Sequence, residues 1–503
     1  VVPVEDLSGL GQADREAAVE RALGEIVRRH EALRTTFAEV DGAPVQVIAP
    51  FDGFTLLVED LSELGEADRE AALRRRAGEE GTRPFDLAAG PLFRATLLRL
   101  GAEDHVLLVG MHHIVGDGWS MGVLSREFSA LYEAYREGRE SPLPELAVQY
   151  ADYAVWQREQ LEGEVLDRQL SYWRERLEGA PELLELPTDH PRPAMQTFRG
   201  TTVPVELSPE LLERLQRLGG SEGATLYMVL LGAFQALLSK YAGSDDVVVG
   251  SPIAGRTRRE VEELIGFFVN TLVLRTDLSG DPSFREVLGR VRETTLGAYE
   301  HQDVPFEKLV EELRPERSLS HSPLFQVMFT LADTDSLGGG LPGVRTEAVE
   351  TEISTTKFDL NLSFAEVDGV LRAVLAYNAD LFERGTAVRM LAQLERVLEQ
   401  VASAPDTRLS RLELLGEADR AQVVEGWNDS ARARTDAPVH ALFAEHARRA
   451  PDAVALLHGG EAITYADLDA RAESLARRLR ALGVGPETPV GLCMDRTPEL
   501  LVG

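Results

Sequence analysis

The sequence predicts an α/β fold built from two lobes of similar size, residues 1–180 and 181–402. The first observation is that apolar strands and amphipathic helices alternate in both stretches. The second is a proline-rich crossing between them, residues 185–199, in which regular structure cannot continue; its prolines are Pro187, Pro191 and Pro193. A site between the two lobes is then the default expectation.

The first lobe contains both periodicities. Apolar residues at helical spacing, such as Val123, Leu124, Phe128 and Leu131, alternate along the chain with short runs rich in Val, Ile and Leu that are typical of strands. The predicted helices are 17–32, 66–77, 119–136 and parts of 151–177, and the predicted strands are 45–48, 92–100 and 105–111.

The second lobe repeats this alternation. Strands are predicted at 247–249, 267–274, 358–364 and 371–377, and helices at 283–300 and 386–402. The most apolar stretch, 224–238, is too short to cross a bilayer, so it is interpreted as a buried core helix. Residues 403–437 form a predicted linker with one helix, and residues 438–503 are interpreted as the start of another domain.

Composition excludes several classes of function. The formal net charge is −32 over 503 residues, which disfavours binding to nucleic acid or to an anionic membrane surface. Cys493 is the single cysteine, so neither an intrachain disulfide nor a cysteine zinc site can form. No basic segment followed by an apolar core opens the chain. We therefore expect a cytoplasmic protein.

One segment occurs twice. Residues 4–18 read VEDLSGLGQADREAA and residues 58–72 read VEDLSELGEADREAA. No further copy follows, so a solenoid is excluded. A local duplication or an error of sequence assembly explains the pair.

The strongest chemical signal is the run from Met111 to Ser120, which reads MHHIVGDGWS. It lies where a strand ends and a helix begins, and Gly116 and Gly118 are expected to allow a sharp turn there. His113 would then face a cleft, where a neutral imidazole can accept a proton from an attacking amine. Asp117, paired with an arginine, would hold the loop.

The same run is compatible with two alternative roles. Adjacent loop histidines are also found as hydrogen-bonded polar residues with no catalytic role, and spacing alone does not separate the two cases. A metal site is disfavoured, because His112 and His113 point in different directions and the helical His-x-x-x-His pair is absent. No glycine-rich phosphate loop indicates a nucleotide cofactor in the two lobes.

His112, His113, Asp117 and Gly118 form the pattern His-His-x-x-x-Asp-Gly, which resembles the active-site motif of condensation domains in nonribosomal peptide synthetases. Five further segments resemble core motifs of that family in the same order: 29–37 (RHEALRTTF), 150–157 (YADYAVWQ), 265–272 (IGFFVNTL), 301–306 (HQDVPF) and 322–329 (SPLFQVMF). The similarity extends from about residue 20 to about residue 415. Six ordered motifs make a chance match untenable.

The resemblance implies a chloramphenicol-acetyltransferase-like fold, with two lobes in a V-shaped pseudo-dimer crossed by a tunnel. It implies an acyltransferase that joins two thioesters through an amide bond, each delivered on the phosphopantetheine of a carrier domain. Upstream donor and downstream acceptor carriers are the expected partners, within a multimodular synthetase. No cofactor or metal is expected in the domain itself.

The same resemblance implies roles for individual residues. His113 matches the catalytic second histidine, and Gly118 lies where a side chain would narrow the tunnel. Arg256 is expected to pair with the structural Asp117. Asn270 is expected to order the wall of the second lobe, although a plain strand-end cap explains it equally well. Tyr153, Trp156, Pro305 and Phe306 are interpreted as packed residues with no catalytic role.

Two ends of the sequence depart from this pattern. The family's first core motif is missing and the duplicated segment stands in its place, which puts the first-lobe sheet in doubt. Residues 463–468 (ITYADL) resemble the opening of an adenylation domain, and such a domain uses ATP and Mg²⁺ only when complete. The chain is interpreted as a fragment of a larger synthetase. The residues around Asp117 and Asn270 most resemble domains that join two L-residues.

Two alternative functions remain open from the sequence. A freestanding acyltransferase of the same fold would use coenzyme A thioesters, and the linker and adenylation start argue against it. A non-catalytic recruitment module of this fold is the other, and the intact His112, His113, Asp117 and Gly118 argue against that.

Overall fold

The computed structural model describes the whole chain except residues 1, 6–11, 317, 333–354, 368 and 433–435. The chain divides into two compact units, Val1–Leu415 and Gly416–Gly503. The first unit contains both lobes.

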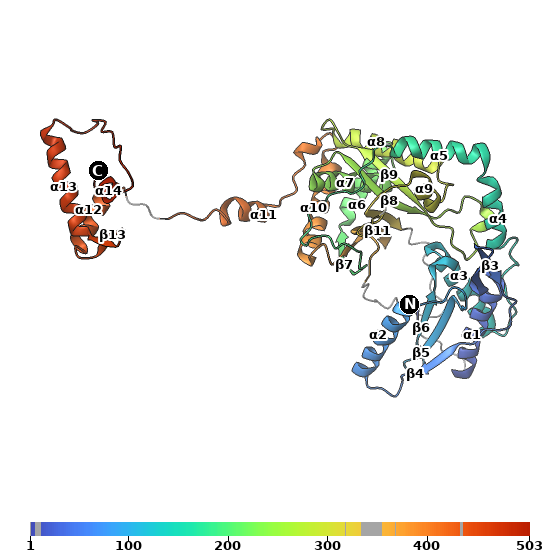
Figure 1. The fold of residues 1–503 in the computed structure, drawn as a ribbon. Helices are drawn as coiled ribbons and strands as arrows, with labels where there is room; N and C mark the ends of the chain where they lie inside the picture. Colours follow the sequence, from blue (N-terminus) through green and yellow to red (C-terminus); the bar gives the residue numbers. More distant parts are fainter. Residues whose placement is uncertain (1, 6–11, 317, 333–354, 368, 433–435) are drawn as a thin grey trace. The chain divides into compact units, whose positions relative to one another are not determined.

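The first lobe is built on a four-stranded sheet in the order β1 (Val2–Glu5), β6 (Asp104–Met111), β5 (Phe93–Arg99), β4 (Leu57–Asp60) (Figure 1). The β1–β6 and β6–β5 pairs are antiparallel, and the β5–β4 pair is parallel. The doubtful sheet is therefore present. The first residues of the two copies of the duplicated segment, Val4–Glu5 and 58–60, lie in its two edge strands, β1 and β4.

Helices cover both faces of this sheet because successive strand residues point to opposite sides. Phe93, Ala95 and Leu97 pack against α1 (Gln12–Arg29) and α3 (Gly118–Arg136). Leu98, one residue further on, packs against α2 (Glu66–Thr82). The lobe also contains the antiparallel hairpin β2 (Thr35–Val40) and β3 (Ala43–Ile48), and the helix α4 (Tyr150–Gln160). The next helix, α5 (Gly163–Leu177), packs Leu170, Trp173 and Leu177 against the core of the second lobe.

The second lobe contains a six-stranded sheet. The strand order is β7 (Gly200–Leu207), β12 (Val370–Asn378), β11 (Leu360–Val367), β10 (Val327–Ala332), β8 (Asp246–Ile253), β9 (Asn270–Asp277). The helices are α6 (Pro209–Ser221), α7 (Leu226–Ala242), α8 (Phe284–Glu300), α9 (Phe306–Leu313) and α10 (Arg384–Ser403). The predicted core helix is confirmed, since α7 buries Val229, Leu230 and Leu231 completely.

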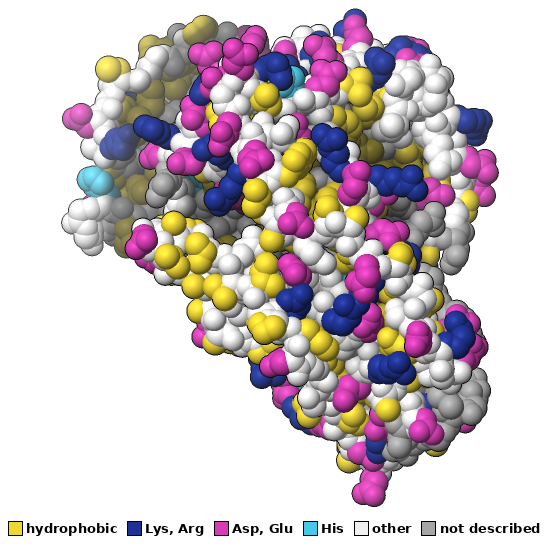
Figure 2. Space-filling model, turned by 90° about the vertical axis from the view of Figure 1, so that its right-hand side faces the viewer, with side chains coloured by type: hydrophobic (Ala, Val, Ile, Leu, Met, Phe, Trp, Pro, Cys, Tyr) yellow, Lys and Arg dark blue, Asp and Glu magenta, His cyan; other side chains and the backbone are white. Residues whose placement is uncertain are grey.

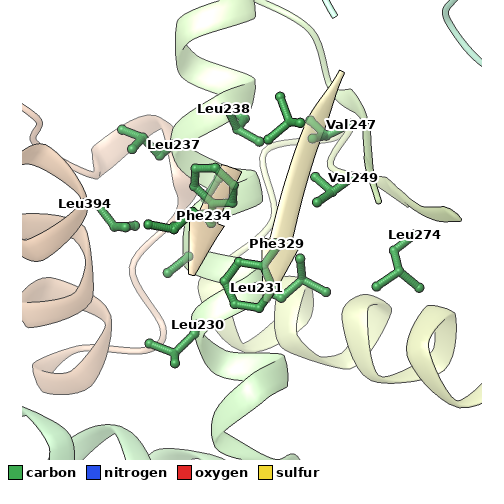
Figure 3. Packing of buried hydrophobic residues seen from close by; sticks show 14 of the residues in the cluster. Leu230, Leu231, Phe234, Leu237, Leu238, Val247, Val249, Leu274, Phe329 and Leu394 are labelled. Atoms are coloured by element: carbon green, nitrogen blue, oxygen red, sulfur yellow. The ribbon is translucent and has the colours of Figure 1, made fainter. Parts of the chain in front are cut away.

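Figure 3 shows the centre of this core, where Phe234 of α7 meets Phe329 of β10 and Leu394 of α10. Such a residue stabilises the fold by about 1.5–3 kcal/mol when it leaves water. The packed core therefore holds the sheet of the second lobe in place. The first residue of β9, Asn270, lies at the end of the strand nearest the first lobe.

One predicted strand begins later than expected. The apolar run 267–274 suggested a strand throughout, but β9 starts only at Asn270. The backbone N–H groups of Phe268 and Val269 instead donate to the side chain of Asp117 in the first lobe. A distant carboxylate thus replaces the sheet partner.

The second unit is small. Its helices are α11 (Glu417–Ala421), which continues into a wide turn at Gln422–Gly426, α12 (Val439–Arg449), α13 (Tyr465–Ala481) and α14 (Pro498–Val502). The strands β13 (Val454–His458) and β14 (Glu461–Thr464) pair antiparallel. Val439, Leu457 and Leu482 are more than 70% exposed, so this unit leaves much apolar surface in water.

The surface charge and the hydropathy of the helices can be compared with the sequence composition. On the face drawn in Figure 2, acidic and basic side chains are interspersed. Within the described ranges, no single helix combines the length and hydropathy of a membrane span. Only α6 and α7 together pass that test, with a bend of 102° between them.

Candidate active site

The His-His-x-x-x-Asp-Gly run lies at the junction of the two lobes. β6 ends at Met111, a short 3-10 turn covers His113–Val115, and α3 begins at Gly118. Asp117 caps this helix through a hydrogen bond from the Ser120 backbone N–H. The strand end and the capped helix therefore determine where both histidines stand.

His113 is the exposed member of the pair. Its Nδ1 lies 2.8 Å from the carbonyl oxygen of Gly116. A carbonyl oxygen only accepts, so Nδ1 carries the proton and Nε2 of the neutral ring presents a lone pair. Within the described part of the chain, Nε2 has no hydrogen-bond partner. The ring edge-packs against Phe267 with centroids 5.1 Å apart.

His112 has the opposite arrangement. Its Nδ1 accepts the backbone N–H of Ile114 at 3.0 Å, and Phe85 packs edge-on against its ring. Burial lowers the pKa of His112, and the nearby charges of His113 and Lys357 act in the same direction. His112 therefore shapes the turn that presents His113.

Asp117 and Arg256 form the ion pair that the resemblance implied. The two side chains are about 2% and 1% exposed, and Arg256 Nη2 lies 3.2 Å from Asp117 Oδ1. The other carboxylate oxygen accepts the N–H groups of Phe268 and Val269 at 2.9 and 3.2 Å. Burial lowers the pKa of Arg256, and the Asp117 charge opposes that effect. The carboxylate thus joins the lobes and contacts no open space.

The expectation that Gly116 and Gly118 adopt backbone angles closed to other residues was wrong. Gly116 has φ −169°, an extended conformation open to any residue, and Gly118 is not in the left-handed region either. A Cβ built on Gly118 would meet no atom within 4 Å. Gly118 therefore leaves space open beside the turn, and the backbone geometry does not require it.

Asn270 organises a turn of the second lobe. Its Nδ2 donates to the carbonyl oxygens of Gln302 and Val304, both at 2.8 Å. Its Oδ1 accepts the N–H groups of Phe306 and Thr271. This side chain stands at the first residue of β9, so it both begins the strand and holds the turn.

A cavity of about 540 Å³ opens next to this turn, between α4 and the second lobe. Phe267 lines it and also contacts the ring of His113. Tyr153, Trp156 and Pro305 line it as well, and Tyr153 also packs against Phe268, as expected for a packed residue. The guanidinium of Arg258 lies over Trp156 at 5.1 Å. Helical spacing placed these aromatics on one face without showing that the face is open.

Comparison with known proteins decides the family. The model of the condensation-domain family matches residues 9–424. The chain belongs to the condensation-domain family. The α/β fold expected from the sequence is confirmed by the two sheets described above and by the solved structures reported below. Residues 443–503 match the AMP-binding enzyme family.

Relatives of this condensation domain are synthetase subunits. The chain is 48% and 50% identical to two subunits of linear gramicidin synthase of Brevibacillus parabrevis, over 97% of its length. It spans about a tenth of each of them. Among solved structures, the X-domain from teicoplanin biosynthesis is 34% identical, with a TM-score of 0.74 over 82% of this chain and 92% of that one. A four-domain nonribosomal peptide synthetase shares the fold, with a TM-score of 0.81 over 96% of this chain and 37% of that one.

Proposed function

We propose that this condensation domain forms amide bonds in nonribosomal peptide synthesis. The observation that carries the proposal is His113, an exposed residue whose Nε2 is left as an acceptor, in a motif whose Gly118 has no atom within 4 Å of a built Cβ. The amine of an aminoacyl thioester would attack the carbonyl carbon of a donor thioester. A carbon–nitrogen bond forms, the carbon–sulfur bond breaks, and the donor group moves to the acceptor.

Each residue has a distinct proposed part. His113 Nε2 accepts a hydrogen bond or a proton from the attacking amine, and a proton passes to the departing thiolate. His112 holds the turn, while Asp117 and Arg256 join the lobes around it. Gly118 keeps the approach open. Asn270 supports the wall that Phe267 and the neighbouring turn make.

The same proposal implies carrier-domain partners, a cellular location and a domain order for the chain. The thioesters arrive on phosphopantetheine arms of an upstream donor carrier and a downstream acceptor carrier of a multimodular synthetase. We propose a cytoplasmic location, because aminoacyl thioesters are made at the expense of ATP. We propose that residues 1–180 and 181–402 form the condensation domain, that 403–437 link it onward, and that 438–503 begin an adenylation domain.

One observation favours a second candidate, a recruitment module. The teicoplanin X-domain, 34% identical to this chain, is also known in a complex with OxyB. A recruiting domain would bind a partner protein and would not turn over thioesters. His113 in acceptor form favours catalysis, because recruitment places no demand on that nitrogen.

Single-turnover condensation tests the proposal. The protein is mixed with one aminoacyl-loaded donor carrier and one loaded acceptor carrier, and the acceptor is weighed by intact mass spectrometry. A dipeptidyl acceptor is expected, with formation slowed about 10²–10⁴-fold in His113→Ala. An L-configured donor should react faster than its D-epimer if the domain joins two L-residues.

Controls separate the alternatives. His190→Gln alters an exposed histidine in the crossing segment and should leave the rate unchanged. Coenzyme A thioesters in place of the donor carrier test for a freestanding acyltransferase. Product from neither donor, with a folded parent protein, would contradict catalysis and favour recruitment.

A further inference from the structure

A five-residue loop of the second lobe, residues 265–269, is bound along its whole length by the first lobe. The N–H of Ile265 donates to Nδ1 of His30 at 3.2 Å. Gly266 contacts Ser120 Oγ through both its N–H and its carbonyl oxygen. The carbonyl oxygen of Phe267 accepts the Tyr150 hydroxyl at 2.8 Å.

The loop reaches the candidate active site through one ring. Phe267 sits between two hydrogen-bonded neighbours, and its side chain packs edge-on against His113 at 89° between the ring planes. Among the described residues, the hydrogen bond to the His113 ring comes from the Gly116 carbonyl oxygen, which accepts from Nδ1. The direction of Nε2 therefore depends on where the loop places Phe267.

His30 is suited to hold this loop because its two hydrogen-bond partners determine which ring nitrogen carries the proton. The side chain is about 1% exposed, and Ile265 N–H requires an acceptor at Nδ1. The neutral ring then carries its proton on Nε2, which donates to Glu127 at 2.9 Å. Arg29 binds the same carboxylate at 3.0 Å and supplies the countercharge. His30 thus connects the buried Arg29–Glu127 ion pair of the first lobe to the loop backbone.

We propose that His30 and Tyr150 are positioning residues for the reaction at His113, acting through loop 265–269. The inference rests on the proposed condensation function. Neither side chain contacts the reacting atoms: each holds the loop backbone, the loop places Phe267, and Phe267 fixes the plane of the His113 ring. A displacement of about 1 Å at a reacting group can cost on the order of 10²-fold in rate.

Two amide substitutions divide the contacts of His30. In His30→Asn, the side-chain oxygen can occupy the place of Nδ1 and accept the Ile265 N–H, but the contact with Glu127 is lost. In His30→Gln, the terminal amide can reach Glu127, but no acceptor faces Ile265. Both changes are uncharged and both remove one hydrogen bond, so general destabilisation does not separate them.

The test measures single-turnover rate against acceptor concentration for the parent and both variants. We expect His30→Gln to lower the maximal rate on the order of 10- to 100-fold with an unchanged half-saturating concentration. His30→Asn should restore the rate to within about threefold of the parent. Equal loss in both variants, or no loss in His30→Gln, overturns the inference.

Two further measurements keep the test decisive. Should His30→Gln fail to fold, Tyr150→Phe removes a single hydroxyl from the same loop. A several-fold lower maximal rate supports the inference, and an unchanged rate overturns it. Imidazole ¹⁵N shifts of His113 report its tautomer without turnover. If the folded parent makes no product, the proposed function fails, and a tautomer change in His30→Gln but not in His30→Asn still decides the positioning role.

Discussion

At the scale of single residues, the two adjacent histidines differ in which ring nitrogen carries the proton. His112 accepts a backbone N–H at Nδ1, whereas His113 donates from Nδ1 to a backbone carbonyl. The lowered pKa of His112 favours its neutral form near neutral pH, so it adds no positive charge beside His113. The pair therefore has one structural and one available imidazole.

The Asp117–Arg256 pair gives a stability prediction. Asp117→Asn places an amide NH₂ against backbone N–H donors and leaves a buried guanidinium without its countercharge. We expect a loss of about 3–5 kcal/mol in the free energy of unfolding, measured by urea titration. Asp68→Asn on the exposed side of α2 is the matched control and should change it by less than about 0.5 kcal/mol. A small effect at Asp117 would show that the pair is dispensable.

The Glu127 cluster gives a pH prediction. Burial alone would raise the pKa of Glu127, but the hydrogen bonds from His30 and Arg29, together with the charge of Arg29, outweigh it and hold the pKa below its ordinary 4.5. A lowered carboxyl pKa adds stability above the unfolded value, and that contribution is lost as pH falls through the folded value. Glu127→Gln should weaken unfolding stability at pH 7 and flatten its decline below about pH 4.5. Parallel pH curves would contradict this.

At the scale of elements, loop 265–269 shows how a segment can belong to one lobe by sequence and to the other by contact. Its apolar run resembled a strand, yet four of its backbone N–H groups donate to first-lobe side chains. A backbone N–H that leaves the sheet must find another partner when buried. The side chains of the His-His-x-x-x-Asp-Gly helix and of His30 supply these partners.

Two glycines near the junction should respond differently to an added methyl group. Gly255 has φ +64°, and its Cβ would lie 2.0 Å from the Phe268 carbonyl oxygen, so Gly255→Ala should lower the free energy of unfolding by at least about 2 kcal/mol. Gly118→Ala meets open space and should leave stability near that of the parent. The same change should slow condensation, because the methyl group enters the approach to His113. Thermal melts and single-turnover rates check both outcomes.

At the scale of the whole molecule, the two compact units differ in how much they bury. The unit Val1–Leu415 has extensive cores in both lobes, whereas the unit Gly416–Gly503 buries few large side chains among those described. Residues 417–432, at the start of the second unit, are exposed throughout, including Trp427 at 71%. The second unit therefore gains less stability from its own hydrophobic core.

Limited proteolysis should separate these units. We expect first cuts between residues 417 and 432, because this described stretch is exposed and exposed backbone is cleaved first. A resistant product ending near Leu415 should keep its cooperative thermal transition, while the released fragment should be degraded or aggregate. Peptide masses locate the cuts. Early cuts within the crossing 185–199 would instead show that the lobes separate more readily than the units.

The sequence by itself determined the family, the alternation of strands and helices, and the order of the chemical motifs. These follow from local patterns: periodicity identifies α3 and β5, and the spacing of His112, His113 and Asp117 identifies the turn. Only the tertiary structure decided which nitrogen of His113 is free, why β9 begins at Asn270, and that Trp156 lines a cavity. The start of β9 depends on a contact between Asp117 and Phe268, which lie 151 positions apart, and no local pattern encodes a contact across that separation. The cavity likewise brings Trp156 together with Asn270. The free nitrogen of His113 depends on a hydrogen bond to Gly116, only three residues away, but the spacing of the motif does not show which way the ring turns.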